Sequence, residues 1–233
     1  MGASQTDKMT APQFSKSVVA NRPRDMLALW EICSVVTSCL IAEWVVLSFV
    51  GRSKSIAAIP VTLSLGLIAF SYRERGDTLK QIGFRLDNLM AAVRLLLLPT
   101  ILAVVLIFII TWIFAGSDLL LRTPRPRFLF VPLWALFQQA ILQGFINRRA
   151  QMVLGPGLRS ILLVAIVFSL VHLPNLPLAG ITLLGGLVWA AVYQREPNLF
   201  ALALSHSIAS IALALWLPPS LINSLRVGFK YFG

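Results

Sequence analysis

The sequence has few charged residues and very few acidic ones. Asp and Glu together number 9 in 233 residues, charged residues make up 12%, and 58% of the chain is hydrophobic, with a mean hydropathy of +0.82. Soluble domains rarely have this balance. Apolar runs of roughly 17 to 25 residues, long enough for a helix to cross a membrane, recur along the chain, whereas the alternating pattern of a membrane β-barrel does not. The sequence therefore predicts an all-α integral membrane protein.

Cysteine and histidine are equally scarce, with two of each. Cys33 and Cys39 both fall in the first apolar run, and their spacing is not CxxC, so neither a disulfide framework nor a cysteine metal site is predicted. A net charge of +11 would suggest nucleic-acid binding in a soluble protein. Here Lys and Arg lie almost entirely between apolar runs, which indicates membrane topology instead.

The apolar runs predict a polytopic transmembrane helical bundle of about seven membrane helices in one membrane domain, residues 27–217. A polar N-terminal segment, 1–26, is expected to lead into a membrane anchor rather than to be a cleaved signal. A short basic C-terminal tail, 218–233, is expected to follow. The predicted spans are 27–50, 55–72, 92–115, 128–146, 158–174, 177–194 and 199–217.

Charge between the spans gives two further predictions. Most Lys and Arg residues fall on the N-terminal side of seven alternating crossings, so the N-terminus should be cytoplasmic. Segment 73–91 mixes charges with leucine and isoleucine. It fits either an amphipathic stretch in the membrane interface or a solvated connector.

Three groups of polar residues lie inside predicted spans, where such side chains are costly and normally face the bundle interior. The first is FQQAILQG, residues 137–144. In a helix, Gln139 and Gln143 share a face with Asn147, and Gln138 lies about 100° to one side. Amides at this spacing also hold neighbouring helices together, and this alternative stays open.

The other two groups contain the chain's two histidines. His172 lies in FSLVHLPN, residues 168–175, and His206 lies in LSHSIAS, residues 204–210, where it shares a helix face with Ser210. The histidines either share a site or pack separately in the core. Two acidic residues lie in the first apolar run. Glu43 is a further candidate that could instead lie near the interface or pair with an Arg, and Glu31 is expected to meet headgroups or water.

Taken in this order, the three groups resemble the motifs of the CPBP family, the CAAX-protease and bacteriocin-processing membrane proteins, also called Abi or type II CAAX prenyl endopeptidase-like proteins. The family pattern is Glu-Glu-x-x-x-Arg, then Phe-x-x-x-His, then His-x-x-x-Asn with replacements tolerated at the last position. QQAILQ stands at the first motif, Phe168 to His172 fits the second, and His206 to Ser210 fits the third. The resemblance covers residues 128–217.

The resemblance implies an intramembrane endopeptidase in which a Glu, assisted by two His, activates water. Carried onto this chain, these positions are Gln138, His172 and His206, while the second Glu and the Arg correspond to Gln139 and Gln143. An amide is far too weakly basic to take a proton from water, and losing a general base typically costs roughly a hundredfold to ten-thousandfold in rate. The exchange is nonetheless coherent, because it leaves no unpaired charge in the membrane.

Two functions therefore stay open. The first is an endopeptidase acting on membrane-associated peptides or proteins, with one His as base and the other stabilising the oxyanion. The alternative is a catalytically inactive pseudoprotease that binds a membrane segment or lipidated peptide as a regulator, chaperone or immunity factor. A transporter finds little support beyond Pro60 and Pro99 within spans.

No cofactor is expected, and zinc is not predicted, because two His without a nearby acidic or cysteine ligand make a poor zinc site. The expected partners are membrane lipid and a membrane-embedded or lipidated peptide or protein, and not nucleic acid. The expected location is a bacterial cytoplasmic membrane.

Overall fold

A computed structural model describes residues 22–46, 54–115, 122–123 and 126–232, and in these residues it contains helices and no strand. The all-α prediction is confirmed. Most of the predicted N-terminal segment lies outside the described residues. The longer helices are α1 (Arg22–Leu40), α3 (Lys54–Arg75), α5 (Leu89–Ala115), α6 (Val131–Gln139), α7 (Arg148–Leu154), α8 (Leu158–Leu170), α9 (Leu176–Arg195) and α10 (Leu199–Trp216). The shorter ones are η1 (Ile41–Val46), α4 (Leu79–Ile82), η2 (Pro126–Phe130), η3 (Ala140–Asn147), α11 (Pro219–Ile222), η4 (Asn223–Leu225) and η5 (Gly228–Tyr231).

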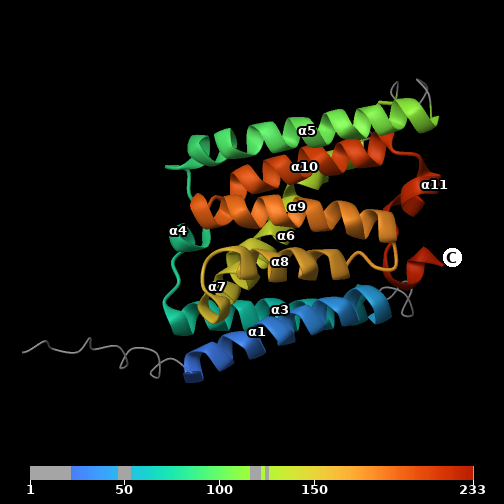
Figure 1. The fold of residues 1–233 in the computed structure, drawn as a ribbon. Helices are drawn as coiled ribbons and strands as arrows, with labels where there is room; N and C mark the ends of the chain where they lie inside the picture. Colours follow the sequence, from blue (N-terminus) through green and yellow to red (C-terminus); the bar gives the residue numbers. More distant parts are fainter. Residues whose placement is uncertain (1–21, 47–53, 116–121, 124–125, 233) are drawn as a thin grey trace, which may run out of the picture.

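The long helices lie alongside one another in a layered bundle. In Figure 1, α5, α10, α9, α8, α3 and α1 follow one another from top to bottom, and α6 runs behind α9 to pack on α10. The main core draws buried side chains from every layer, including Val35 of α1, Phe145 of η3 and Leu202 of α10. A smaller core, around Ile222 of α11, closes the opposite end from α4 and α7.

Four helical runs of the described residues are long and apolar enough to cross a membrane: Leu89–Phe114, Phe128–Leu154, Leu176–Arg195 and Leu199–Trp216. Two shorter apolar helices, Met26–Leu40 and Leu158–Leu170, accompany them. α5 exposes large apolar side chains, which is typical of a helix that faces lipid. The chain is an integral membrane protein, while seven crossings remain a prediction.

The predicted span 128–146 is part of a longer helical run that continues through η3 and α7 to Leu154. η3 is π-helical, and π-helical turns inside α-helices are frequent at functional sites. The prediction ended too early because two arginines follow the apolar residues. In the structure, Arg149 is fully buried and paired with Glu31 of α1 and with Asp77, which follows α3, so the helix can continue past it.

Within segment 73–91, α3 ends at Arg75, α4 forms one helical turn, and α5 begins at Leu89. Thr78 caps α4 in a capping box with Gln81, whose side chain accepts from Thr78 N at 2.9 Å. Ile82 is only 3% exposed and belongs to the main core, whereas Leu79 is 68% exposed. Phe84 and Leu89 also pack against this core, so several apolar side chains anchor the segment to the bundle. The interfacial stretch and the solvated connector both stay predictions.

The segment predicted as a C-terminal tail folds back on the turn between α8 and α9. Asn175 Nδ2 donates to the carbonyl oxygens of Ile222 (2.7 Å) and Arg226 (3.0 Å). Gly228 N donates to Leu173 O at 2.9 Å. These bonds join the turn that follows His172 to the end of the chain.

Candidate functional site

The amides of the first motif lie in the interior of the bundle. Gln139, Gln143 and Asn147 have no exposed surface, although the backbone between them is π-helical. Asn147 Nδ2 donates to Gln143 Oε1 at 2.8 Å and to Ala190 O at 3.3 Å, which ties this run to α9. The helix-joining alternative thus describes part of what these amides do.

Two further glutamines extend these amides into a hydrogen-bonded column that consists of Gln143, Asn147, Gln151 and Gln194. Asn147 Oδ1 accepts from Gln151 Nε2 (3.1 Å) and Gln194 Nε2 (3.0 Å). Gln194 Nε2 also donates to Ser160 Oγ at 2.9 Å. In each hydrogen bond between two members of this amide column, the donor lies nearer the α4–α7 end of the bundle and the acceptor nearer Gln143. Gln151 continues the four-residue spacing of the motif and could have been found from it, whereas Gln194 and Ser160 arrive from other helices.

Gln139 contacts one of the two histidines. Gln139 Nε2 lies 3.2 Å from His206 Nδ1, and because an amide nitrogen only donates, Nδ1 is the acceptor. The ring proton of His206 is then on Nε2. His206 is 7% exposed and lies over the Trp189 ring, with centroids 4.4 Å apart and planes inclined by 32°.

A chain of hydrogen bonds holds Trp189 beneath His206. Trp189 Nε1 donates to Ser205 Oγ at 3.1 Å. Thr100 Oγ1 donates to Leu96 O at 2.7 Å, so Ser205 Oγ donates in turn to Thr100 Oγ1, also at 2.7 Å. α5, α9 and α10 therefore fix the orientation of this ring jointly.

Phe168 brings the two histidines to one place. Its ring makes edge contacts with His172 (centroids 4.8 Å apart) and with His206 (5.7 Å). His172 Nδ1 lies 2.6 Å from Phe168 O, and because a carbonyl only accepts, Nδ1 carries the proton. Neutral His172 therefore has an unprotonated Nε2, whereas neutral His206 has a protonated one.

Two predicted site residues lie at the margin of this group. Gln138 is half-buried on the adjoining face of α6, and Ser210 is half-buried one turn beyond His206 on α10. Within the described part of the chain, no hydrogen bond joins either of them to Gln139, His172 or His206.

Two amide atoms of the site are buried without a hydrogen-bond partner among the described residues. They are Gln139 Oε1, an acceptor, and Gln143 Nε2, a donor. A buried polar group left unpaired costs about 1 to 3 kcal/mol, so such atoms are usually matched by a ligand or water. Together they offer the two kinds of group that pair with the N–H and C=O of a peptide.

The sequence did not predict a buried ion-pair cluster at the α4–α7 end, formed by Glu31, Arg75, Asp77, Arg148 and Arg149. Arg149 Nε lies 3.0 Å from Glu31 Oε2, at an angle that makes this an ion pair rather than a hydrogen bond. Arg149 Nη2 lies 3.0 Å from Asp77 Oδ2, Arg75 Nη2 lies 3.0 Å from Glu31 Oε2, and Arg148 pairs with Asp77.

The prediction from sequence that Glu31 contacts headgroups or water is therefore wrong. Glu31 is 9% exposed and also accepts from Ser71 Oγ at 2.8 Å, because α3 and α7 bring its partners to α1. The side chain of Glu43 lies outside those described. Among the described residues, no group of three or more His, Cys, Asp or Glu is placed to hold a metal, and the expected lack of a cofactor stays a prediction.

Comparison with known proteins agrees with the motifs. Residues 126–212 match the family described as type II CAAX prenyl endopeptidase Rce1-like. No curated protein and no solved structure matches the chain. The matched segment contains the glutamine motif, Phe168, His172, His206 and Ser210. Residues 126–212 therefore form an Rce1-like domain, and for this segment the CPBP family predicted from the three motifs is confirmed.

Proposed function

We propose that the protein is a pseudoprotease of the CPBP type, which binds a membrane-embedded or lipidated peptide at the Gln139–His206 site without cleaving it. One observation carries this proposal. The site keeps both histidines, while Gln139 Oε1 and Gln143 Nε2, at positions where the family has Glu and Arg, are buried amide atoms without a partner in the described part of the chain. An amide acceptor and an amide donor on one helical run are suited to a peptide group and unsuited to removing a proton from water.

An endopeptidase is the second candidate function, because the two histidine rings carry their protons on different nitrogens. His172 Nε2 is free to accept a proton, and His206 Nε2 carries one that could be donated to a developing oxyanion. Gln138 would then orient the water. In this reading, His172 performs the task of the family's Glu.

The two candidates separate in a cleavage and binding assay on the purified full chain. We expect a photoreactive lipidated peptide to crosslink to the unmodified protein, with no cleavage product. Gln138→Glu, alone or with Gln139→Glu and Gln143→Arg, restores the family's groups and is expected to produce cleavage. Gln81→Glu makes the same chemical exchange at exposed α4 and serves as the control.

Cleavage by the unmodified protein that His172→Ala and His206→Ala both abolish would establish the endopeptidase instead. Absence of crosslinking in the unmodified protein, together with no cleavage by any variant, would exclude both candidates. Stoichiometric zinc in the purified protein would overturn the proposal that the site works without a metal.

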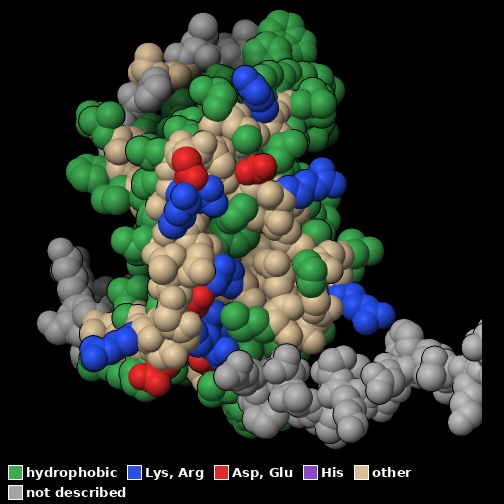
Figure 2. Space-filling view, turned by 90° about the vertical axis from the view of Figure 1, so that its left-hand side faces the viewer, with side chains coloured by type: hydrophobic (Ala, Val, Ile, Leu, Met, Phe, Trp, Pro, Cys, Tyr) green, Lys and Arg blue, Asp and Glu red, His purple; other side chains and the backbone are tan. Residues whose placement is uncertain are grey.

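We further propose that the protein resides in a bacterial cytoplasmic membrane with its N-terminus in the cytoplasm. Figure 2 looks onto the end of the bundle where α1 begins, and Lys, Arg, Asp and Glu are spread over it with apolar side chains at the margins. Basic loops favour the cytoplasmic side. Labelling of a cysteine introduced at exposed Lys80 from the periplasmic side of intact cells would contradict this orientation.

A further inference from the structure

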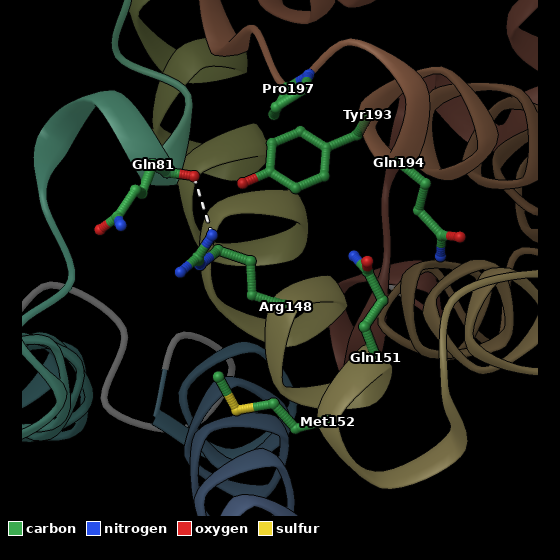
Figure 3. A pocket seen from close by; sticks show the side chains of 7 residues that line it. All are labelled: Gln81, Arg148, Gln151, Met152, Tyr193, Gln194 and Pro197. Atoms are coloured by element: carbon green, nitrogen blue, oxygen red, sulfur yellow. Dashed lines mark hydrogen bonds between the residues drawn. The ribbon is translucent and has the colours of Figure 1, made fainter.

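A pocket of about 190 Å³ opens at the α4–α7 end of the bundle, and none of the predicted site residues lines it. It is smaller than the roughly 300 Å³ at which pockets for drug-sized ligands begin, so it suits one chemical group rather than a whole ligand. Figure 3 shows its lining: Gln81, Arg148, Gln151, Met152, Tyr193, Gln194 and Pro197.

The charge around this pocket is positive. Arg148 is the one charged residue in the lining. Behind it, the cluster contains three guanidinium groups, of Arg75, Arg148 and Arg149, against the two carboxylates of Glu31 and Asp77. One positive charge is therefore uncompensated within the cluster. A neighbouring anion would offset it, which favours an anionic occupant.

Hydrogen-bond donors remain available at the pocket. The Arg148 guanidinium has five N–H groups. One is used on Gln81 O at 2.9 Å, one on Asp77 and one on the Tyr193 hydroxyl oxygen, and Nε is buried without a partner among the described residues. The remaining N–H is on a terminal nitrogen of the guanidinium. Gln151 uses one of its two amide hydrogens on Asn147. In Figure 3 the Gln151 amide points into the space below the Tyr193 ring, beside Arg148.

We propose that this pocket binds a phosphate group. A guanidinium whose N–H groups are only partly used, next to an amide donor with a spare hydrogen, suits the acceptor oxygens of a phosphate. Basic pockets between helices at the cytoplasmic side of membrane proteins bind anionic headgroups. The phosphate belongs either to a phospholipid headgroup or to a soluble compound. This inference goes beyond the proposed function, because the pocket is separate from the histidines.

The test uses the purified full chain and measures its thermal unfolding midpoint. One arm compares sodium phosphate with sodium chloride at equal ionic strength, and the other compares nanodiscs of phosphatidylglycerol with nanodiscs of phosphatidylcholine. A ligand that binds the folded state raises the midpoint. We expect the midpoint to rise with phosphate or with phosphatidylglycerol, and the arm that responds identifies the source.

Substitutions at Gln151 assign the effect to the pocket. Gln151→Glu places a negative charge beside Arg148 and should weaken binding about tenfold, whereas Gln151→Lys should tighten it severalfold. Arg159→Gln is the matched control, because it also lowers the net charge by one but is exposed and outside the lining, and should leave binding nearly unchanged.

Three results would overturn the proposal. They are no response in either arm, equal weakening by Gln151→Glu and Arg159→Gln, and binding that Gln151→Lys leaves unchanged. Midpoints measured in chloride alone show whether each variant folds. If Gln151→Glu does not fold, Gln151→Lys decides the question by itself.

Discussion

Asn147 joins the motif helix to α9. Both of its side-chain atoms are used, by Gln143 and Ala190 on one side and by Gln151 and Gln194 on the other. It has no exposed surface, so water cannot replace these partners. Asn147 therefore provides hydrogen-bond partners for other buried amides and also ties its own helix to α9.

We predict that Asn147→Leu destabilises the protein by several kcal/mol, because each buried group left unpaired costs about 1 to 3 kcal/mol. The measurement is the unfolding free energy of the purified chain in detergent. Gln138→Leu is the control, because half-buried Gln138 makes no hydrogen bond with Gln139, His172 or His206, and its loss should matter little. Similar losses in both variants would contradict the role assigned to Asn147.

At the residue scale, sequence spacing predicted which side chains lie together wherever all of them belong to one helix. The four-residue repeat of Gln139, Gln143 and Asn147 predicted three side chains that the structure buries together. It could not predict Gln194, which reaches Asn147 from α9, or the partners of Glu31, because helix periodicity carries no information on which helices become neighbours. The pairing of His206 with Gln139 rather than with Gln138 also depends on that packing.

At the scale of helices, hydropathy predicted where the helices lie better than it predicted where they end. The predicted span 199–217 nearly coincides with α10, and 177–194 nearly coincides with α9. The span ending at 146 stopped short of Leu154, because a sequence rule treats arginines as a boundary unless their buried partners are known.

The packing of α8 on α9 depends on a glycine. A Cβ atom at Gly186 would lie 2.9 Å from the backbone Cα of Ala165, and that atom cannot move without shifting α8. We predict that Gly186→Ala lowers stability by about 1 to 3 kcal/mol, the usual range for an overpacked core. The measurement is again the unfolding free energy.

Gly180→Ala is the matched control on the same helix. A Cβ atom at Gly180 would have no neighbour within 4 Å, so alanine should be neutral or stabilise the helix by up to about 1 kcal/mol. Equal effects of the two substitutions would mean that helix propensity, and not the contact with Ala165, governs this pair.

At the scale of the whole molecule, the family match leaves α1, α3 and α5 outside it, and the ion-pair cluster fastens two of them to the matched segment. Glu31 comes from α1, Arg75 from α3, and Arg149 from α7. Asp77 follows α3 and pairs with both arginines of α7. The cluster therefore holds the N-terminal helices in place around the Rce1-like domain.

We predict that Glu31→Gln destabilises the protein by about 3 to 5 kcal/mol, the usual cost of removing one partner from a buried ion pair. The substitution keeps the shape of the side chain but leaves Arg75, Arg148 and Arg149 with one carboxylate. Adding Arg75→Gln returns the charge surplus to one and should recover part of the loss.

Asp87→Asn, in a half-exposed pair with Arg85, is the control and should change little, because exposed pairs contribute weakly. Unfolding free energies of the four proteins, with the unmodified chain as reference, provide the comparison. A loss for Glu31→Gln no larger than that for Asp87→Asn would show that apolar packing alone holds α1 and α3 to the domain.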